Sequence, residues 1–340
     1  FAMSLSSLFA RALAATALCA SIAPVGAQTD WAAVEAAAKR EGKVVLYSAH
    51  VGVPYHPEIA KMFTAKYGIE VEILEARASE IRERIRTEHA TGRVAGDVSY
   101  NGASTTFLMQ QQGLLQAHQG VPNRSKLDGS FYQSDYQFPV YIQSYAILVN
   151  SKLVPPDRRP KRWTDLLDPK WQGKIISDDL RALGGGGAMF SVTYKNLGRD
   201  FHEKLAAQKL HFTRAVRESP RRVARGEFQV AIPFAIPDSL LHQGLPLEVV
   251  LPEEGNPYIT YDVAVLKGAP HPNAARLFMN FFLTDEAQMV FLRSGRGSPV
   301  KGMNAKAPES VRALVNAKLM GTPEFETMED LLKTAKDIYK

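Results

Sequence analysis

The stretch KVVLYSAHVGVPYHPEIAKMFTAKYGIEVEIL, residues 43–74, decides the fold class of this chain. It opens with a continuous run of β-favouring residues at 43–47, which is typical of a strand buried on both faces. Apolar residues at helical spacing then predict a helix that ends at Gly68, and residues 69–74 predict a second strand. A strand, a helix and a strand in this order indicate parallel pairing, because the helix returns the chain to the same end of the sheet.

The same alternation continues toward both ends of this stretch. An alanine-rich helix is predicted before it, at 31–40. After it, Ile81 and Ile85 mark a helix whose other face is charged. Residues 97–100 predict a strand, and a further helix ends at Gly113. This βαβαβα order predicts an α/β fold in which a parallel sheet carries helices on both faces.

A second set of elements repeats the pattern. The predicted strands are 174–177, 228–232 and 247–251, and the predicted helices are 188–196, 237–243 and 273–283. Two longer extended segments, 139–150 and 257–266, flank this second set. We expect them to be the crossovers of a two-lobed protein.

Residues 1–27 have the layout of a secretory signal peptide. Arg11 precedes a short apolar run at 12–20, and small residues lead to Ala27, after which we expect cleavage and release into the periplasm. The run is too short to span a bilayer as a helix. Cys19, the one cysteine, would leave with this leader, so the mature chain is expected to be stabilised by its core rather than by disulfides.

The charge pattern does not call for a polyanionic partner. The formal net charge is +6, and Arg11 contributes one of these charges. Two arginine-rich segments, at 158–162 and 214–225, have no aromatic residues interleaved with the charges, so they favour solvated faces over nucleic-acid binding. In the second segment we expect a helix with Ser219 as its N-cap and Pro220 at its first position.

Seven short segments, taken in order and spacing, carry a family resemblance. They are residues 44–49, 145–150, 163–174, 225–227, 252–257, 265–275 and 281–284. Together they resemble the periplasmic solute-binding proteins of ABC importers, in the branch of ferric-ion, thiamine, polyamine and phosphonate binders. The resemblance covers essentially the whole chain after the leader.

This resemblance implies a type II-like periplasmic-binding-protein fold, with two α/β lobes joined by a hinge, ligand in the cleft, and closure recognised by a membrane permease. We expect lobe 1 to comprise residues 28–140 and 262–308, and lobe 2 to comprise residues 141–261 with the hinge strands at its ends. Residues 309–340 are expected to form C-terminal helices that pack on the lobes. The protein is expected to be a monomer.

Ligands of open parallel sheets bind beyond the carboxyl ends of the strands. Two loops of the first set of elements meet this description, and their candidate ligand-binding residues are Ser48, Ala49 and His50, and Asn101, Gly102, Ala103 and Ser104. His50 is equally well explained as an exposed loop histidine, and Ser104 as a plain helix cap. Capping and binding are compatible, because free amides at a helix start attract anions.

A glycine run ahead of the predicted helix at 188–196 is the sharpest local feature. Gly184, Gly185, Gly186 and Gly187 allow backbone amides to approach an anion closely. Asp178 and Arg181 precede the run, and Arg181 is a candidate partner for an oxyanion. No Lys-Ser/Thr pair follows, so the run is not a nucleotide-binding P-loop. The alternative is a flexible surface turn.

The two crossovers supply the remaining candidates. The first presents Tyr141, Gln143 and Tyr145 on one face, and the second carries Tyr258, Tyr261 and Asp262. Ordinary core aromatics are the alternative explanation for the tyrosines.

The residues after the Gly226-Glu227 pair bear on the ligand. The iron-binding relatives carry adjacent tyrosines after the strand that follows this pair, whereas this chain has Phe234-Ala235. Phenylalanine cannot ligate ferric iron, so we expect no metal and no cofactor, and Phe234 indicates an apolar wall. The expected ligand is a small organic anion, of the carboxylate or the phosphate and phosphonate type. A ferric ion or iron chelate is the alternative.

A polyamine or thiamine is a third choice, because only Asp178, Asp179 and Asp262 are plausible cleft carboxylates. A secreted α/β hydrolase is the alternative from another class. The chain has no Gly-x-Ser-x-Gly elbow, no His-Glu-x-x-His motif and no cysteine after the leader, so we expect that it is not an enzyme.

Overall fold

The strands of the chain join into one curled sheet of mixed direction. The structure is a computed structural model that describes residues 30–340, so the predicted leader at 1–27 lies outside the described residues. The strands are β1 (Lys43–Ser48), β2 (Glu70–Glu75), β3 (Val98–Gly102), β4 (Leu115–Gln116), β5 (Gln137–Asn150), β6 (Ile175–Asp178), β7 (His211–Thr213), β8 (Val230–Ala235), β9 (Leu247–Val250), β10 (Asn256–Leu266) and β11 (Leu319–Gly321). The sheet runs β2-β1-β3-β10-β5-β8-β6-β7, with β4 and β11 paired to β10, and β9 to β5.

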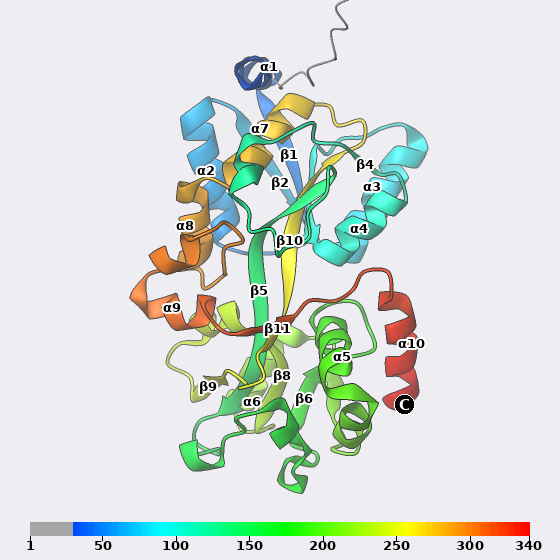
Figure 1. Cartoon of the computed structure of the whole chain (residues 1–340), viewed down its shortest axis with the longest axis vertical. Coiled ribbons are helices and arrows are strands. Elements are labelled where there is room, and N and C mark those ends of the chain that lie inside the picture. The colour runs from blue at the N-terminus through cyan, green and yellow to red at the C-terminus, as the bar shows by residue number, and fades with distance from the viewer. Residues whose placement is uncertain (1–29) are drawn as a thin grey trace, which may run out of the picture. The chain divides into compact units, whose positions relative to one another are not determined.

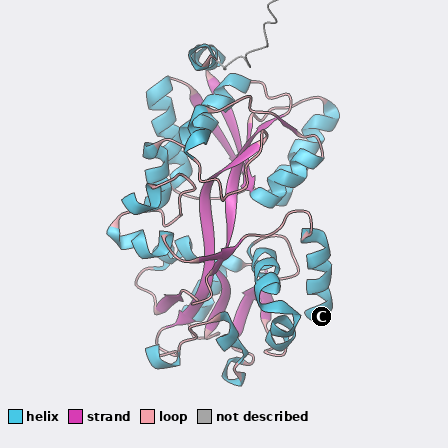
Figure 2. Ribbon diagram, viewed as in Figure 1, coloured by secondary structure: helices cyan, strands magenta, loops and turns pink. Residues whose placement is uncertain are grey.

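Helices flank this sheet along its length, as Figure 2 shows, and the α/β class is therefore confirmed. They are α1 (Trp31–Glu41), α2 (Tyr55–Tyr67), α3 (Ala78–Thr91), α4 (Ala103–Gln111), α5 (Gly185–Ala206), α6 (Ser219–Ala224), α7 (Pro272–Phe282), α8 (Asp285–Arg293), α9 (Glu309–Val315) and α10 (Met328–Ile338). Two 3-10 helices, η5 (Val216–Glu218) and η6 (Ile236–His242), matter for the site below.

The first block of the sheet follows the sequence pattern closely. Strand β1 pairs in parallel with both β2 and β3, so the predicted parallel arrangement is confirmed for these strands. The predicted loop at 101–104 is wrong, because β3 continues to Gly102 and α4 begins at Ala103. Asn101 and Gly102 pair with Asp262 and Tyr261 of β10, so the sheet uses residues that the sequence placed in a loop.

The two predicted crossovers lie side by side at the centre of the sheet. Strands β5 and β10 pair antiparallel, from Tyr258 opposite Ser144 to Ala264 opposite Gln137. Figure 1 shows them running together between the two blocks of elements. Each long strand also pairs antiparallel with a neighbour in its own block, β10 with β3 and β5 with β8. The sheet is therefore mixed rather than wholly parallel.

The second block contains the larger corrections. Strand β6 pairs in parallel with β7 and β8, as expected. Helix α5 begins at Gly185, three residues before the predicted start, and its backbone is non-helical at Gly198. Ser219 is the first residue of α6 and Glu218 is the N-cap, so the predicted Ser219 cap is wrong. The structure forms η5 immediately before it, and that turn carries the chain into α6.

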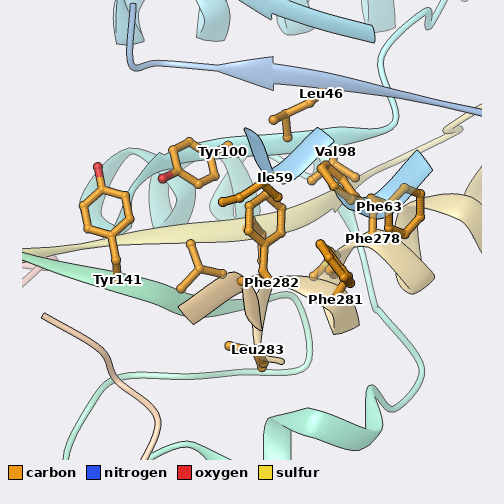
Figure 3. Packing of buried hydrophobic residues seen from close by; sticks show 14 of the residues in the cluster. Leu46, Ile59, Phe63, Val98, Tyr100, Tyr141, Phe278, Phe281, Phe282 and Leu283 are labelled. Atoms are coloured by element: carbon orange, nitrogen blue, oxygen red, sulfur yellow. The ribbon is translucent and has the colours of Figure 1, made fainter. Parts of the chain in front are cut away.

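Residues 30–340 form four clusters of buried hydrophobic side chains, and the two largest, the first and second core, lie at the two ends of the sheet. The first surrounds β1, β3, α2 and α7, where the rings of Phe63 and Phe278 lie 4.8 Å apart (Figure 3). The second contains Trp163 and Phe190, both fully buried. Each fully buried aromatic side chain of this kind contributes about 1.5–3 kcal/mol.

The C-terminal helices divide between these cores. Val311 of α9 belongs to the first core, whereas Ala335 of α10 and Tyr339 belong to the second. The predicted lobe boundaries at residues 140 and 261 remain predictions. No helix of residues 30–340 is both long and apolar enough to cross a membrane.

Candidate functional site

A cavity of about 720 Å³ lies beside the central strands and is lined by elements of both blocks. The lining residues belong to the loop after β1 and the start of α2, to β5, to the end of β6, to the segment of η5 and α6, to β8 and η6, and to the end of α8 with the loop after it. A volume of this size accommodates a small organic molecule. This cavity is the candidate functional site.

Six of the residues predicted from the sequence line this cavity. They are His50, Gln143, Tyr145, Asp178, Gly185 and Phe234. They come from four segments that are far apart in the sequence, and the fold brings them together. Whether they contact a ligand remains a prediction.

Three further predicted residues lie directly behind His50. The rings of Tyr141 and Tyr261 stack with centroids 4.8 Å apart, and the Tyr141 hydroxyl lies 2.8 Å from His50 Nδ1. Ser48 is buried, and its hydroxyl accepts a hydrogen bond from the His50 amide. These residues hold the histidine in place. Ala49 donates its amide to the Tyr100 carbonyl, so it belongs to the sheet.

The glycine run has a different role from the one expected. The Gly186 amide donates to Asp178 Oδ2 at 2.7 Å, so a carboxylate of the protein already caps helix α5. An added Cβ at Gly186 would lie 2.4 Å from the Asp179 carbonyl oxygen, and one at Gly187 equally close to Ala182. These two glycines therefore allow close packing of the helix start. Neither they nor Gly184 line the cavity, which Gly185 reaches.

Arg181 does not line the cavity either. Its guanidinium donates to Asp179 at 2.8 Å and to the Tyr339 carbonyl at 3.0 Å, and it lies over the Phe212 ring. These contacts hold the C-terminal segment against the second core. The structure therefore does not bring Arg181 to the place where an oxyanion was expected.

The remaining predicted residues also lie outside the lining. Gly102, Ala103 and Ser104 form the junction of β3 and α4. Tyr258 packs edge-on against Phe131. Asn101 and Asp262 are buried within the sheet.

Asp262 is a buried carboxyl in a polar cluster that is short of donors. Its Oδ2 accepts a hydrogen bond from the Gln137 side chain at 2.8 Å. Within residues 30–340, Asp262 Oδ1, Asn101 Oδ1 and Gln137 Oε1 have no hydrogen-bond partner. Burial raises the pKa of Asp262 to about 7, against the opposing effect of the Thr260 hydroxyl and the Gln137 amide. A proton on this carboxyl supplies one of the missing donors.

Arg296 is a charged residue of the cavity that the sequence analysis did not single out. It lines the cavity, yet the residue is only 5% exposed. Its guanidinium lies 4.6 Å from the Tyr55 ring centroid and 5.5 Å from that of Tyr141, and Nη1 donates to the Ser294 carbonyl. Its Nε has no partner among the described residues, and no carboxylate of residues 30–340 forms an ion pair with it.

The loop that carries Arg296 is fixed to a central strand. Backbone hydrogen bonds join Gly297 and Ile142 of β5 in both directions, at 2.7 and 3.0 Å. A sequence signal for this position exists, because an arginine stands between Gly295 and Gly297 directly after a helix. That signal becomes informative only when the loop is known to meet β5.

The other charged residues of the lining differ in how they are compensated. Arg293 is paired with Glu58 at 2.6 Å, and Arg217 donates to the Val51 carbonyl at 2.6 Å. Asp238 of η6 forms no ion pair within the described part of the chain. Its pKa is raised by burial, and the nearby charge of Arg296 acts in the opposite direction.

The charge states around the site follow from burial. Burial lowers the pKa of His50 well below its ordinary value, so the imidazole is neutral. Burial likewise raises the pKa of Tyr55 and, further, of Tyr141, so both phenols are protonated. Burial lowers the pKa of Arg296, but the phenols and the Asp238 carboxylate raise it more, and the guanidinium stays charged. The cavity therefore contains one buried cation with unused donors.

A metal centre of the usual side chains is not formed by residues 30–340, where no group of three or more His, Cys, Asp or Glu side chains is placed to hold an ion. The tyrosines fall outside that description. Tyr55 and Tyr141 hydroxyls lie 3.4 Å from each other and within 2.9 Å of His50 Nδ1. These two phenols and this imidazole are the side chains that could serve as ligands of a ferric ion here.

The sequence profile of the bacterial extracellular solute-binding proteins matches residues 44–296, and the chain belongs to this family. An uncharacterised protein of Haemophilus influenzae is 25% identical over 281 residues, which are 77% of this chain and 79% of that protein.

Two solved structures extend the comparison. The ferric binding protein from Campylobacter jejuni has a TM-score of 0.73 at 20% identity, covering 87% of this chain and 98% of its own. The periplasmic binding protein AfuA from Actinobacillus pleuropneumoniae, with fructose-6-phosphate bound, has a TM-score of 0.68 at 26% identity, covering 87% and 97%. The predicted two-lobed periplasmic binding fold is confirmed, and the protein is a periplasmic solute-binding protein of the ABC-importer type.

The buried carboxyl of Asp262 makes stability depend on pH. Because its folded pKa is raised above the ordinary 3.8, its contribution to stability is complete below about pH 4 and is lost as pH rises to about 7. Asp262→Asn should remove this loss while supplying a donor. From about pH 5 to pH 8, the free energy of unfolding of the parent should fall by roughly 2–3 kcal/mol relative to the variant.

Urea denaturation at several pH values measures this difference. Asp157→Asn, an exposed carboxylate on η2 (Pro156–Arg158), is the matched control and should follow the parent. Parallel curves for the parent and Asp262→Asn would show that Asp262 is ionised throughout.

Proposed function

We propose that this protein is the extracytoplasmic substrate-binding component of an ABC importer, and that it captures a small organic anion in the 720 Å³ cavity. The ligand would carry a carboxylate, or a phosphate or phosphonate group. The observation that carries this proposal is Arg296, a buried guanidinium in the cavity wall that has an unpartnered Nε and no ion pair within residues 30–340.

A buried charge without a counter-ion is costly, because the interior solvates it poorly. An incoming anion provides both the missing charge and the missing acceptors, and a guanidinium fork matches the two oxygens of a carboxylate or phosphate. The guanidinium packs over the rings of Tyr55 and Tyr141, and two backbone hydrogen bonds between Gly297 and Ile142 fix the loop that carries it. Arg296 is therefore oriented before ligand arrives.

The rest of the lining suits an organic body rather than a bare ion. Phe234, Ile232, Leu240 and Val290 present apolar side chains to the cavity. Burial of an organic skeleton against them adds affinity roughly in proportion to the apolar area removed from water. AfuA, whose structure contains fructose-6-phosphate, is a relative with a ligand of this class.

Delivery to a permease would use closure of the cleft. We infer that β5 and β10 act as the hinge, because β5 contributes residues to both cores and β10 pairs with it at the centre of the sheet. In this role the protein binds and releases its ligand as a monomer and performs no chemistry on it.

The anion site is tested by Arg296→Met, which keeps the packing volume and removes the charge. Affinity for the anions that the parent binds should fall at least about tenfold, since a charge-assisted hydrogen bond contributes roughly 1.5–3 kcal/mol. The melting temperature of the ligand-free variant should be unchanged or higher, because replacing a buried unpaired charge by an apolar side chain is neutral or stabilising.

Calorimetry with inorganic phosphate, citrate and fructose 6-phosphate measures the first effect, and thermal unfolding the second. Arg293→Met is the matched control, because this arginine lines the same cavity but is already paired with Glu58. Unaltered anion affinity in Arg296→Met would refute the assignment.

A ferric ion is the second candidate, favoured by the cluster of His50, Tyr55 and Tyr141 and by the ferric-binding relatives. Against it, both phenols are protonated and the Arg296 guanidinium lies over their rings, where it repels a cation. Titration with chelated ferric iron should therefore give no visible phenolate-to-metal band. A strong band that disappears in the Tyr55→Phe/Tyr141→Phe double variant would instead show that these phenols bind ferric iron.

The mature chain should begin at Gln28 and be recovered from the periplasm, because residues 1–27 have the layout of a cleaved leader. Mass spectrometry of the intact periplasmic protein gives the N-terminus directly. A mass that retains residues 1–27, or a lipid on Cys19, would contradict this expectation.

A further inference from the structure

The cavity wall carries carboxylates as well as Arg296. Asp238 on η6 and Asp178 at the end of β6 line the same cavity, and neither forms an ion pair with any described residue. Asp179, which the sequence analysis had counted with Asp178, is paired with Arg181 outside the lining. The negative pole of the cavity therefore consists of Asp238 and Asp178.

These two carboxylates differ in the hydrogen bonds that they accept from the protein. Asp178 accepts backbone hydrogen bonds from Gly186 and Asp179, one on each oxygen. Asp238 accepts no hydrogen bond within residues 30–340. Burial raises its pKa while the charges of Arg296 and Arg217 lower it, although neither arginine forms an ion pair with it. A positively charged ligand group beside Asp238 would give this carboxylate a counter-charge, as an anionic ligand group would give one to Arg296.

We propose that the ligand is a zwitterion, an organic anion that also carries an ammonium group. Its anionic group would bind Arg296, and its ammonium group would bind Asp238, with Asp178 next to it. This inference rests on the proposed function, since it needs an anion at Arg296. The rings of Tyr145 and Phe234 line the cavity too, and aromatic faces favour an ammonium group.

Electrostatics disfavours the simpler ligands. A plain anion held at Arg296 would bring its negative charge toward Asp238, which no cation of the described chain neutralises by direct pairing. A plain amine would leave Arg296 unpaired in the interior. A zwitterion satisfies both poles at once. Hydroxyl groups are the neutral alternative to the ammonium group, and the experiment below separates the two.

The test uses pairs of probes that differ only in the ammonium group. They are β-alanine and propionate, O-phosphoethanolamine and ethyl phosphate, and glucosamine 6-phosphate and glucose 6-phosphate. Calorimetry on the full-length mature protein should show the ammonium-bearing member binding at least about tenfold more tightly in one pair or more. Asp238→Asn should bring that ratio close to one, and should strengthen binding of the plain anion.

Glu218→Gln is the matched control, because Glu218 lines the same cavity but is exposed, so solvent screens its charge. It should leave the ratio of affinities unchanged. Circular dichroism and thermal unfolding confirm that each variant is folded.

Each other result has a distinct meaning. Equal or tighter binding of the plain anion, or a ratio that Asp238→Asn does not change, would overturn the zwitterion while leaving anion binding at Arg296 intact. Equal binding of glucose 6-phosphate and glucosamine 6-phosphate, as the pair that binds, would replace the ammonium group by hydroxyl donors. Binding of none of the six probes by a protein that does bind phosphate, citrate or fructose 6-phosphate would overturn the zwitterion alone. Anion binding that Arg296→Met leaves unchanged would overturn the proposed function and the zwitterion together.

Discussion

The antiparallel pairing of β5 with β10 is the interaction on which the rest of the structure depends. Strand β5 contributes residues to both hydrophobic cores and β10 pairs with it, so the pair joins the two blocks beside the cavity. They also set the site. Tyr141, Gln143 and Tyr145 project from β5, and the bond pair of Ile142 with Gly297 brings the Arg296 loop to the cavity wall. A change in this pairing would move the polar groups that β5 and the Arg296 loop carry.

The cavity contains charged side chains of both signs. The buried guanidinium of Arg296 lies over the rings of Tyr55 and Tyr141, and the carboxylates of Asp238 and Asp178 line the same cavity. Each pole is costly alone, because a low-dielectric interior solvates isolated charges poorly. A ligand that carries the opposite charge can offset this unfavourable free energy at the site. Elsewhere in the cavity the charges of Arg293 and Glu58 compensate each other.

The sequence predicts the fold well because fold depends on local periodicity. The β1 to β3 block follows from buried β-branched runs and amphipathic helices, and the two long extended segments mark the central strands. The site is harder, because it depends on which loops meet. His50 was found in the loop after a predicted strand, Tyr145 on a predicted crossover and Asp178 ahead of the glycine run. Arg296 reaches the cavity only through a loop that pairs with β5. Gly186 and Gly187 misled the prediction, because glycine also serves where a Cβ would collide with backbone.

Membership of the solute-binding family gives the role of the protein, and the physics of its cavity narrows the ligand. The central claim is that the Arg296 guanidinium binds the anionic group of the ligand. A crystal structure of the protein saturated with its tightest-binding anionic probe tests this most directly. The account predicts two anionic oxygens of the ligand within about 2.7–3.2 Å of the Arg296 guanidinium nitrogens. An anionic group bound elsewhere in the cavity, with Arg296 out of contact, would contradict it.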